Sequence, residues 1–199
     1  MPDRPRLLAY GLLAGLGAHS AAWAADAPPA AGRFLEVCFQ HGCASTAIVP
    51  LDERILAELG GIFASAGDGA QERATIARGI AVVERYVGSR TGTDRDLGGT
   101  FPGAFRQGQM DCIDESTNTT RYLRLFEREG WLRRHDVAMP ATRLPIPAGW
   151  WPHTTAVVTE RGTGTAFAVD SWFEANGHPP YIVELGAWRR GWKPARANP

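Results

Sequence analysis

The sequence predicts an α+β domain in which N-terminal helices pack on an antiparallel sheet. Apolar residues recur at helical spacing over residues 51–65 and 70–87, which predicts two helices. A third helix is predicted over 111–129, because an aspartate at its start and a glycine after its end supply both caps. Two β-rich runs, 153–160 and 165–173, then flank a Gly-containing turn, which is typical of a β-hairpin.

The first residues have the pattern of a secretory signal peptide. Basic residues precede the apolar run 7–16, and the segment 22–24 (AWA) has the small residues of a cleavage site. An uncleaved membrane anchor is the alternative. Polar residues interrupt the apolar run well before the roughly 20 residues that a spanning helix needs, which favours the signal peptide.

Export defines the expected domain organisation and location. We expect residues 1–24 to be the signal peptide, 25–33 a Pro- and Ala-rich linker, and 34–199 a single domain. The mature protein is expected to be periplasmic or secreted, without a membrane span. The formal net charge is zero. The chain therefore lacks the basic excess that a nucleic-acid partner requires.

Export also makes disulfides expected, and the chain has three cysteines. Cys38 and Cys43 are close enough in sequence to close a small disulfide loop. The alternative is a metal site that uses His41 with both thiols, but three candidate ligands without a nearby fourth make a poor tetrahedral site. We therefore predict the disulfide, no metal and no cofactor. Cys112 is then the unpaired thiol.

Cys112 lies at the start of the third predicted helix. Asp111 is a suitable N-cap, Asp114 has a capping-box position, and Asp114 and Glu115 suit the positive end of the helix dipole. One side of this helix carries Cys112, Ser116, Thr119, Leu123 and Phe126. Because the small and polar residues come first, the first half of the helix is expected to border a cleft.

The segments between these elements are predicted to be irregular. The second helix is expected to stop at Gly88, and residues 88–110 form a long loop of the kind that is often functional. Residues 137–152 contain four prolines and two tryptophans and are expected to form an irregular connection. The tail after Leu185 carries tryptophans among basic residues and is expected to pack loosely.

A thiol becomes a nucleophile when its thiolate is favoured, and a helix N-terminus contributes to this. The three acids around Cys112 oppose it, because negative charge nearby disfavours a further negative charge. A cationic partner is therefore needed, and imidazolium is the usual one. Of the histidines after residue 24, His153 is the one that begins a predicted strand.

The hairpin places an acid beside His153. A two-residue turn sets His153 directly opposite Asp170, and a four-residue turn sets it opposite Trp172 with Asp170 as the diagonal neighbour on the same face. An odd turn without a bulge separates the two, because strand faces alternate. Asp170 also lies in an apolar strand and needs a partner. The sequence thus predicts Cys112 as nucleophile, His153 as base and Asp170 as the residue that orients the base.

Two segments resemble the transglutaminase-like superfamily, and bacterial transglutaminase-like cysteine proteinases in particular. The segment 111–114 (DCID) is similar to their Asp-Cys-x-Asp, and 153–173 (HTTAVVTERGTGTAFAVDSWF) resembles their His-strand-turn-strand-Asp hairpin. The likeness covers about residues 105–175. It implies a papain/transglutaminase-like fold with the nucleophile at a helix N-terminus. It also implies that Cys112, His153 and Asp170 are the catalytic residues.

The oxyanion donors are less defined by the sequence. The backbone N–H of Cys112 is one expected donor, and Gln107, Gln109 and Trp150 are candidates for a side-chain donor. Trp150 and Trp172 are also candidates to line a cleft for an extended peptide, although such tryptophans are more often part of a core. Some exported members of the family use calcium, but no calcium-loop pattern is present in the sequence.

Two functional classes fit these features. The first is an exported cysteine hydrolase or acyltransferase that cleaves or exchanges an amide or isopeptide bond of a peptide or protein through a Cys-His-Asp triad. The second is a non-catalytic periplasmic binding or assembly module on the same fold. Redox use of Cys112 with Cys38 or Cys43 is a third option.

Overall fold

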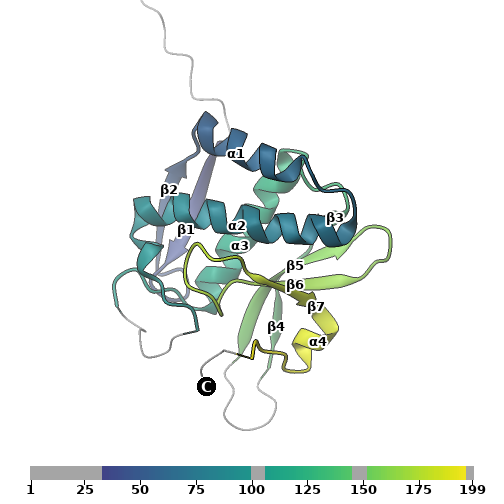
Figure 1. Cartoon of the computed structure of the whole chain (residues 1–199). Helices are drawn as coiled ribbons and strands as arrows, with labels where there is room; N and C mark the ends of the chain where they lie inside the picture. The colour runs from purple at the N-terminus through teal and green to yellow at the C-terminus, as the bar shows by residue number, and fades with distance from the viewer. Residues whose placement is uncertain (1–32, 100–105, 145–151, 196–199) are drawn as a thin grey trace, which may run out of the picture. The chain divides into compact units, whose positions relative to one another are not determined.

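A computed structural model describes residues 33–99, 106–144 and 152–195. The chain divides into two units, Met1–Ala31 and Gly32–Pro199, and all of the described residues belong to the second unit. The predicted signal peptide and nearly all of the predicted linker lie outside the described residues. The second unit combines helices with antiparallel sheets (Figure 1), which confirms the predicted α+β class.

A two-stranded hairpin opens the described part of the chain. β1 (Phe34–Phe39) pairs antiparallel with β2 (Ser45–Pro50). No strand is predicted here from the sequence, because the apolar alternation at Leu35 and Val37 is too short to stand out before the cysteine loop. Both side chains are nevertheless buried in the main core.

Two helices follow the hairpin, α1 (Glu53–Phe63) and α2 (Gly69–Thr91), and an aspartate side chain caps each of them. α2 continues one turn past Gly88, where the sequence predicts its end. Gly88 serves close packing instead, because a Cβ there would lie 3.0 Å from the backbone nitrogen of Asp94. The helix ends at Gly92, whose φ of 82° is the left-handed conformation that glycine favours.

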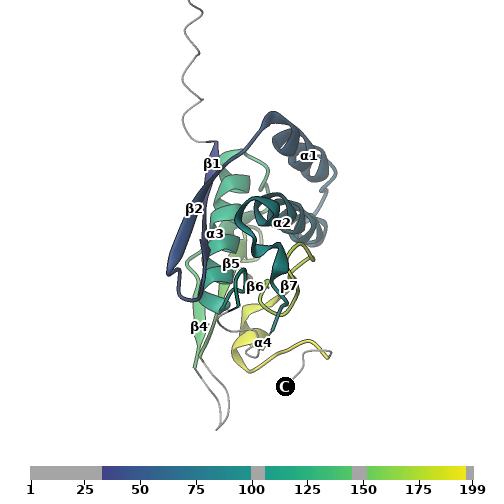
Figure 2. The same ribbon diagram turned by 90° about the vertical axis from the view of Figure 1, so that its left-hand side faces the viewer.

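The third helix, α3 (Cys112–Arg128), is the central element. It contacts the β1–β2 hairpin, α2 and the C-terminal sheet, and Figure 2 shows it next to the hairpin. Asp111 is its N-cap, and the capping box between Asp111 and Asp114 is present as predicted. A short 3₁₀ turn, η1 (Thr93–Arg95), lies in the loop that leads to it.

The C-terminal sheet has the strand order β3-β5-β6-β7, and β4 also pairs with β5. The strands are β3 (His135–Val137), β4 (Ala141–Arg143), β5 (His153–Glu160), β6 (Ala166–Asp170) and β7 (Tyr181–Glu184). β5 and β6 form the predicted hairpin. The segment predicted to be an irregular connection contains β4 and the end of β3, because both strands add to the edge of β5.

The C-terminal segment does not pack loosely, so that prediction was wrong. The short helix α4 (Leu185–Arg189) places Trp188 in a second, smaller core cluster with Val157 and Ala168. Trp188 is completely buried. Its basic neighbours suggest a surface segment, and only the tertiary contact with the sheet reveals that the tryptophan is internal.

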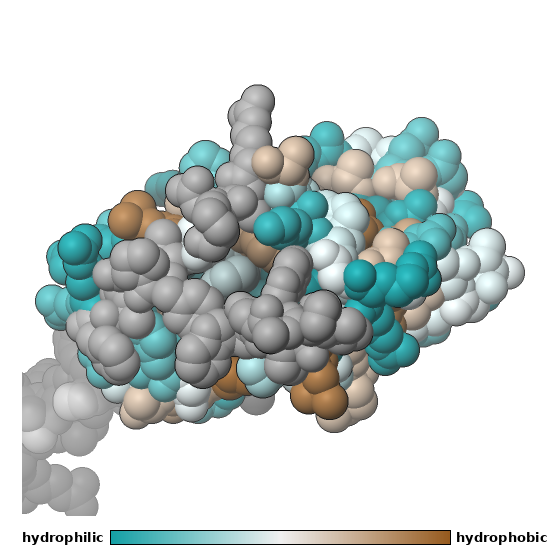
Figure 3. Space-filling model, turned by 90° about the horizontal axis from the view of Figure 1, so that it is seen from below, coloured by the Kyte–Doolittle hydropathy of each residue, from teal (hydrophilic) through white to brown (hydrophobic). Residues whose placement is uncertain are grey.

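A few large hydrophobic residues are exposed on the described surface. Seen from below Figure 1, the coloured part of the surface is a mixture of hydrophilic and hydrophobic residues (Figure 3). The large hydrophobic residues that are exposed in the described part are Phe34, Ile48, Leu97, Ile113, Met139 and Leu144. None of the described helices combines the length and the hydropathy that a membrane-crossing helix requires.

Candidate active site

Cys112 is the first residue of α3, and its thiol is free and partly buried. Asp111 caps the helix by accepting hydrogen bonds from the backbone N–H groups of Ile113 at 3.0 Å and Asp114 at 2.9 Å. No described residue accepts a hydrogen bond from the N–H of Cys112 itself. The sulfur lies 3.9 Å from the carbonyl oxygen of Pro152. The nucleophile candidate therefore faces the start of β5.

His153 and Asp170 form a buried pair. His153 Nε2 lies 2.8 Å from Asp170 Oδ2, and the two side chains are 8% and 1% exposed. The strand register sets Ala156 opposite Val169. When this register is extended by three residues, His153 lies opposite Trp172, with Asp170 as its diagonal neighbour. The hairpin therefore has the four-residue turn, one of the two turn lengths that the sequence allows.

The structure also brings the side chain of Cys112 close to that of His153, where the thiol contributes to the raised pKa of the imidazole. Since Nε2 of His153 is bound to Asp170, the other ring nitrogen, Nδ1, is the one available to the sulfur. Cys112, His153 and Asp170, predicted from separate segments, are thus in one chain of contacts.

The surroundings of His153 favour its charged form. Burial lowers its pKa, but hydrogen bonds to Asp170 and to Cys112, together with the negative charges of both groups, raise it to about 9. At neutral pH the imidazole is therefore protonated. This provides the cation that a thiolate at Cys112 needs beside it.

Three aromatic rings surround the imidazole. The ring centroids of Trp172, Phe173 and Trp188 lie 4.9, 5.4 and 5.5 Å from that of His153. Aromatic faces stabilise a nearby cation. Trp172, a predicted cleft residue, therefore packs directly on the base. Trp188 is a site residue that the sequence does not predict.

The small polar residues of α3 do not line an open surface, contrary to the prediction. Ser116 and Thr119 are buried. Thr119 Oγ1 lies 2.6 Å from Oγ of Ser171, the residue that follows Asp170. The polar half of α3 thus fixes the end of β6 against the helix, and Cys112 remains as its partly exposed residue.

The loop between β1 and β2 has an unusual backbone. Cys38 and Cys43 form the predicted disulfide, which closes the loop. Four consecutive residues, Gln40, His41, Gly42 and Cys43, have positive φ values of 67°, 62°, 65° and 57°. For residues other than glycine this conformation costs about 1–2 kcal/mol each. Other contacts must therefore hold the turn.

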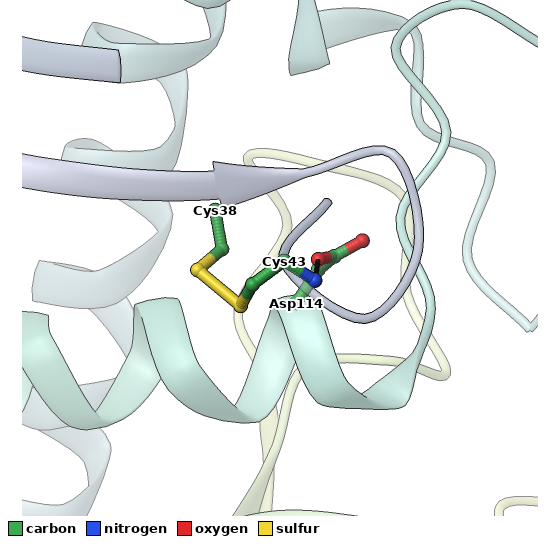
Figure 4. A group of neighbouring side chains, drawn as sticks. All are labelled: Cys38, Cys43 and Asp114. Atoms are coloured by element: carbon green, nitrogen blue, oxygen red, sulfur yellow. Dashed lines mark hydrogen bonds between the residues drawn. A yellow bond between two sulfur atoms is a disulfide. The ribbon is translucent and has the colours of Figure 1, made fainter. Parts of the chain in front are cut away.

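Those contacts come from the two acids of the α3 cap. Asp114 accepts a hydrogen bond from the N–H of His41 at 2.7 Å and another from the N–H of Cys43 at 2.6 Å, the second of which is drawn in Figure 4. Asp111 accepts one from Gly42 at 3.0 Å. These backbone donors offset the negative charge that the acids place beside the thiol, in addition to the capping function predicted from the sequence.

Glu115 does not act as a charge at the helix dipole, which corrects the prediction. Its carboxyl is buried, and burial with the neighbouring charges of Glu84 and Asp96 holds its pKa well above the usual range. Burial, with repulsion from Asp96, raises the pKa of Glu84 to about 8, and burial, with repulsion from Asp114, raises the pKa of Asp96 to about 6. Asp96 bonds to Glu115 and accepts the N–H of Met110 at 2.7 Å. This buried acid cluster therefore anchors the segment that precedes Cys112.

The side-chain oxyanion candidates are not placed together at the thiol. Gln109 is buried, and its amide bonds the carbonyl oxygen of Arg95 at 2.5 Å and the N–H of Leu97 at 3.3 Å. Gln107 is exposed, and Trp150 lies outside the described residues. The backbone N–H of Cys112 remains the oxyanion donor that the geometry supports.

One group of described residues has side chains close enough to suggest a metal site, namely Cys38, Cys43 and Asp114. Both sulfur atoms belong to the disulfide (Figure 4), so they are not available as metal ligands. Asp114 is engaged by the N–H groups of the turn.

Comparison of the chain with known proteins gives no matching family model, no matching curated protein and no matching solved structure. The chemistry proposed below is therefore based on the geometry of the site and on the sequence resemblance described above.

Proposed function

We propose that the protein is an exported cysteine hydrolase or acyltransferase that acts on an amide or isopeptide bond of a peptide or protein. The observation that carries this proposal is the position of His153, hydrogen-bonded to Asp170 at 2.8 Å and close to the side chain of Cys112. A nucleophile, a base and a group that orients the base are the parts that thiol acyl transfer needs.

The order of the elements supports a papain/transglutaminase-like fold. The thiol begins α3, and the following antiparallel sheet carries His153 on β5 and Asp170 on the neighbouring β6. This order is the one that the resemblance to transglutaminase-like cysteine proteinases implies.

In the proposed reaction, the Cys112 thiolate attacks the carbonyl carbon and forms a carbon–sulfur bond. The backbone N–H of Cys112 stabilises the oxyanion. Protonated His153 gives its proton to the leaving amine as the carbon–nitrogen bond breaks, which leaves a thioester. Neutral His153 then takes a proton from water or from a second amine, which attacks the thioester. The carbon–sulfur bond then breaks, which releases a carboxylic acid or a new amide and restores the Cys112 thiolate beside protonated His153.

Two exposed apolar side chains, on the first turn of α3 and on the segment that leads to it, support a peptide substrate. Ile113, next to Cys112, is 41% exposed and Leu97 is 54% exposed. Leu97 is attached to the segment before the nucleophile through the amide of Gln109. In the proposed complex, apolar side chains of an extended peptide pack on Ile113, Leu97 and Trp172.

Alkylation of Cys112 by iodoacetamide, measured against pH, tests the proposal. The wild-type thiol is expected to react near pH 6, because His153 is charged there. In His153→Ala the profile should move to that of an ordinary thiol, near pH 8.5, and the rate near pH 6 should fall about 100-fold. His178→Ala, at an exposed turn, is the matched control. Identical profiles for wild type and His153→Ala would exclude the proposed mechanism.

A non-catalytic binding module remains the second candidate, because the amide of Gln109 is engaged with the 95–97 segment. That function predicts that Cys112→Ala leaves ligand binding and the function of the whole protein unchanged. The redox option requires Cys112 to exchange with a disulfide in which Cys38 and Cys43 are joined to each other. Disulfide mapping by mass spectrometry tests that option.

A further inference from the structure

Asp170 has a second partner besides His153, and it comes from the C-terminal segment. We propose that Trp188, held in place by Arg143, is a positioning residue for the Asp170–His153 pair. The inference rests on the function proposed above. It adds two residues from β4 and α4 to a site that the sequence confines to α3, β5 and β6.

The contact between Trp188 and Asp170 is direct. The indole Nε1–H donates to Asp170 Oδ2 at 2.6 Å, and the same oxygen lies 2.8 Å from His153 Nε2. Both side chains are buried, Asp170 at 1% and Trp188 at 0% exposure. Two donors on one oxygen fix the position of a carboxylate that no longer has water to bind.

Arg143 holds the segment that carries Trp188. Its Nη1 donates to the carbonyl oxygens of Trp188 at 2.7 Å and Trp192 at 2.8 Å. Its guanidinium also lies 4.5 Å from the centre of the Trp188 ring. Arg143 pairs with His153 in the β4–β5 register. The strand next to the base therefore also fixes the residue that supports the acid.

The indole N–H matters for the proton that His153 and Asp170 share. A hydrogen bond to an ionised carboxylate stabilises its charge, so the proton stays on the imidazole. Without the N–H, the buried carboxylate is less stable as an anion, so it attracts the imidazolium proton more strongly, and it is free to rotate away from His153. Both effects disfavour a thiolate at Cys112.

Trp188→Phe tests this inference, because it removes the N–H and keeps an aromatic ring. The pH of half-maximal Cys112 alkylation should rise by about one unit, and the rate at neutral pH should fall about tenfold. Trp131→Phe is the matched control. Trp131 stacks on Phe63 at 5.6 Å in the main core and should leave the profile unchanged.

Two further measurements keep the test decisive if Trp188→Phe does not fold. Arg143→Lys keeps the charge but not the planar guanidinium that lies against the Trp188 ring, and it should shift the profile in the same direction by less. Hydrogen exchange of the Trp188 indole N–H, followed by NMR, should be slow in the wild type and faster in Asp170→Ala. Fast exchange in the wild type would overturn the inference.

The two proposals fail in different ways. If His153→Ala abolishes the alkylation at low pH while Trp188→Phe and Arg143→Lys match the wild type, the positioning inference is wrong and the proposed function stands. If wild-type alkylation does not depend on His153, the proposed function fails. In that case the positioning inference fails as well. Slow exchange of the indole N–H that becomes fast in Asp170→Ala would then show that the bond from Trp188 to Asp170 is purely structural.

Discussion

One buried carboxyl, Asp170, and a cluster of three buried carboxyls adjoin the first turns of α3, and their environments are opposite. Asp170 faces a cation and accepts the indole N–H of Trp188. Glu84, Asp96 and Glu115 instead face one another, and burial raises the pKa of each. The same functional group is thus arranged in one place to hold a charge and in another to hold a proton.

These environments determine how the free energy of unfolding depends on pH. The pKa of Glu84 is raised from 4.5 to about 8, so the folded chain binds this proton more tightly than the unfolded chain. The free energy of unfolding therefore falls as the pH rises between these values. His153, raised from 6.5 to about 9, contributes stability that is present below 6.5 and lost through 9. Both groups make the fold less stable in alkali.

Asp170→Asn should have the largest effect, because it removes the charge that faces the imidazolium. Alkylation of Cys112 near pH 6 should fall about 100-fold or more. Leaving a buried cation without its partner should also lower the free energy of unfolding by about 3 kcal/mol. Alkylation profiles and urea unfolding at neutral pH measure the two effects. An unchanged alkylation profile would show that Asp170 does not act through His153.

Glu84→Gln, an equivalent acid-to-amide change, should have the opposite effect. Because the buried acid holds a proton, the amide should preserve the fold at pH 5 and make it more stable than the wild type at pH 8. The fall in Tm between these pH values should shrink by about 2–4 °C for each kcal/mol of penalty removed. Thermal unfolding at both pH values measures this. Equal destabilisation at both would mean that Glu84 is needed as a charge.

The catalytic candidates could be predicted because each depends on local pattern. Asp111 as a cap places Cys112 at a helix start. The alternation within one hairpin places His153 and Asp170 on one face. These signals lie within short segments, and the helix and hairpin preserve them in the fold.

The supporting residues could not be predicted in the same way, because their contacts join distant segments. Trp188 reaches Asp170 from the chain end, and its sequence neighbours resemble a surface. Glu84 and Glu115 are on different helices, where an acid is ordinarily a sign of a solvated face. Nothing local in Gln40 or His41 specifies their positive φ, which the contacts with the α3 cap hold.

The disulfide loop stabilises carboxyls in a third way, through backbone N–H donors. Its removal should have an intermediate effect on stability and on alkylation. Replacing both Cys38 and Cys43 by Ser should release the turn from Asp111 and Asp114. The free energy of unfolding should fall by about 2 kcal/mol, the value expected for so short a loop. Alkylation of Cys112 near pH 6 should fall severalfold, since the two acids lose their donors. A change in stability alone would limit the loop to a structural function.

Replacement of an exposed carboxyl should have the smallest effect, and it provides the baseline for the three preceding predictions. Glu53 forms an ion pair with Arg33, and their side chains are 85% and 41% exposed. Glu53→Gln should change the free energy of unfolding by less than about 0.5 kcal/mol, with no change in the alkylation profile, because water and salt screen such pairs. Urea unfolding at low and high salt measures this. A loss of unfolding free energy comparable to that in Asp170→Asn would mean that burial does not explain why Asp170 matters more than an exposed carboxyl.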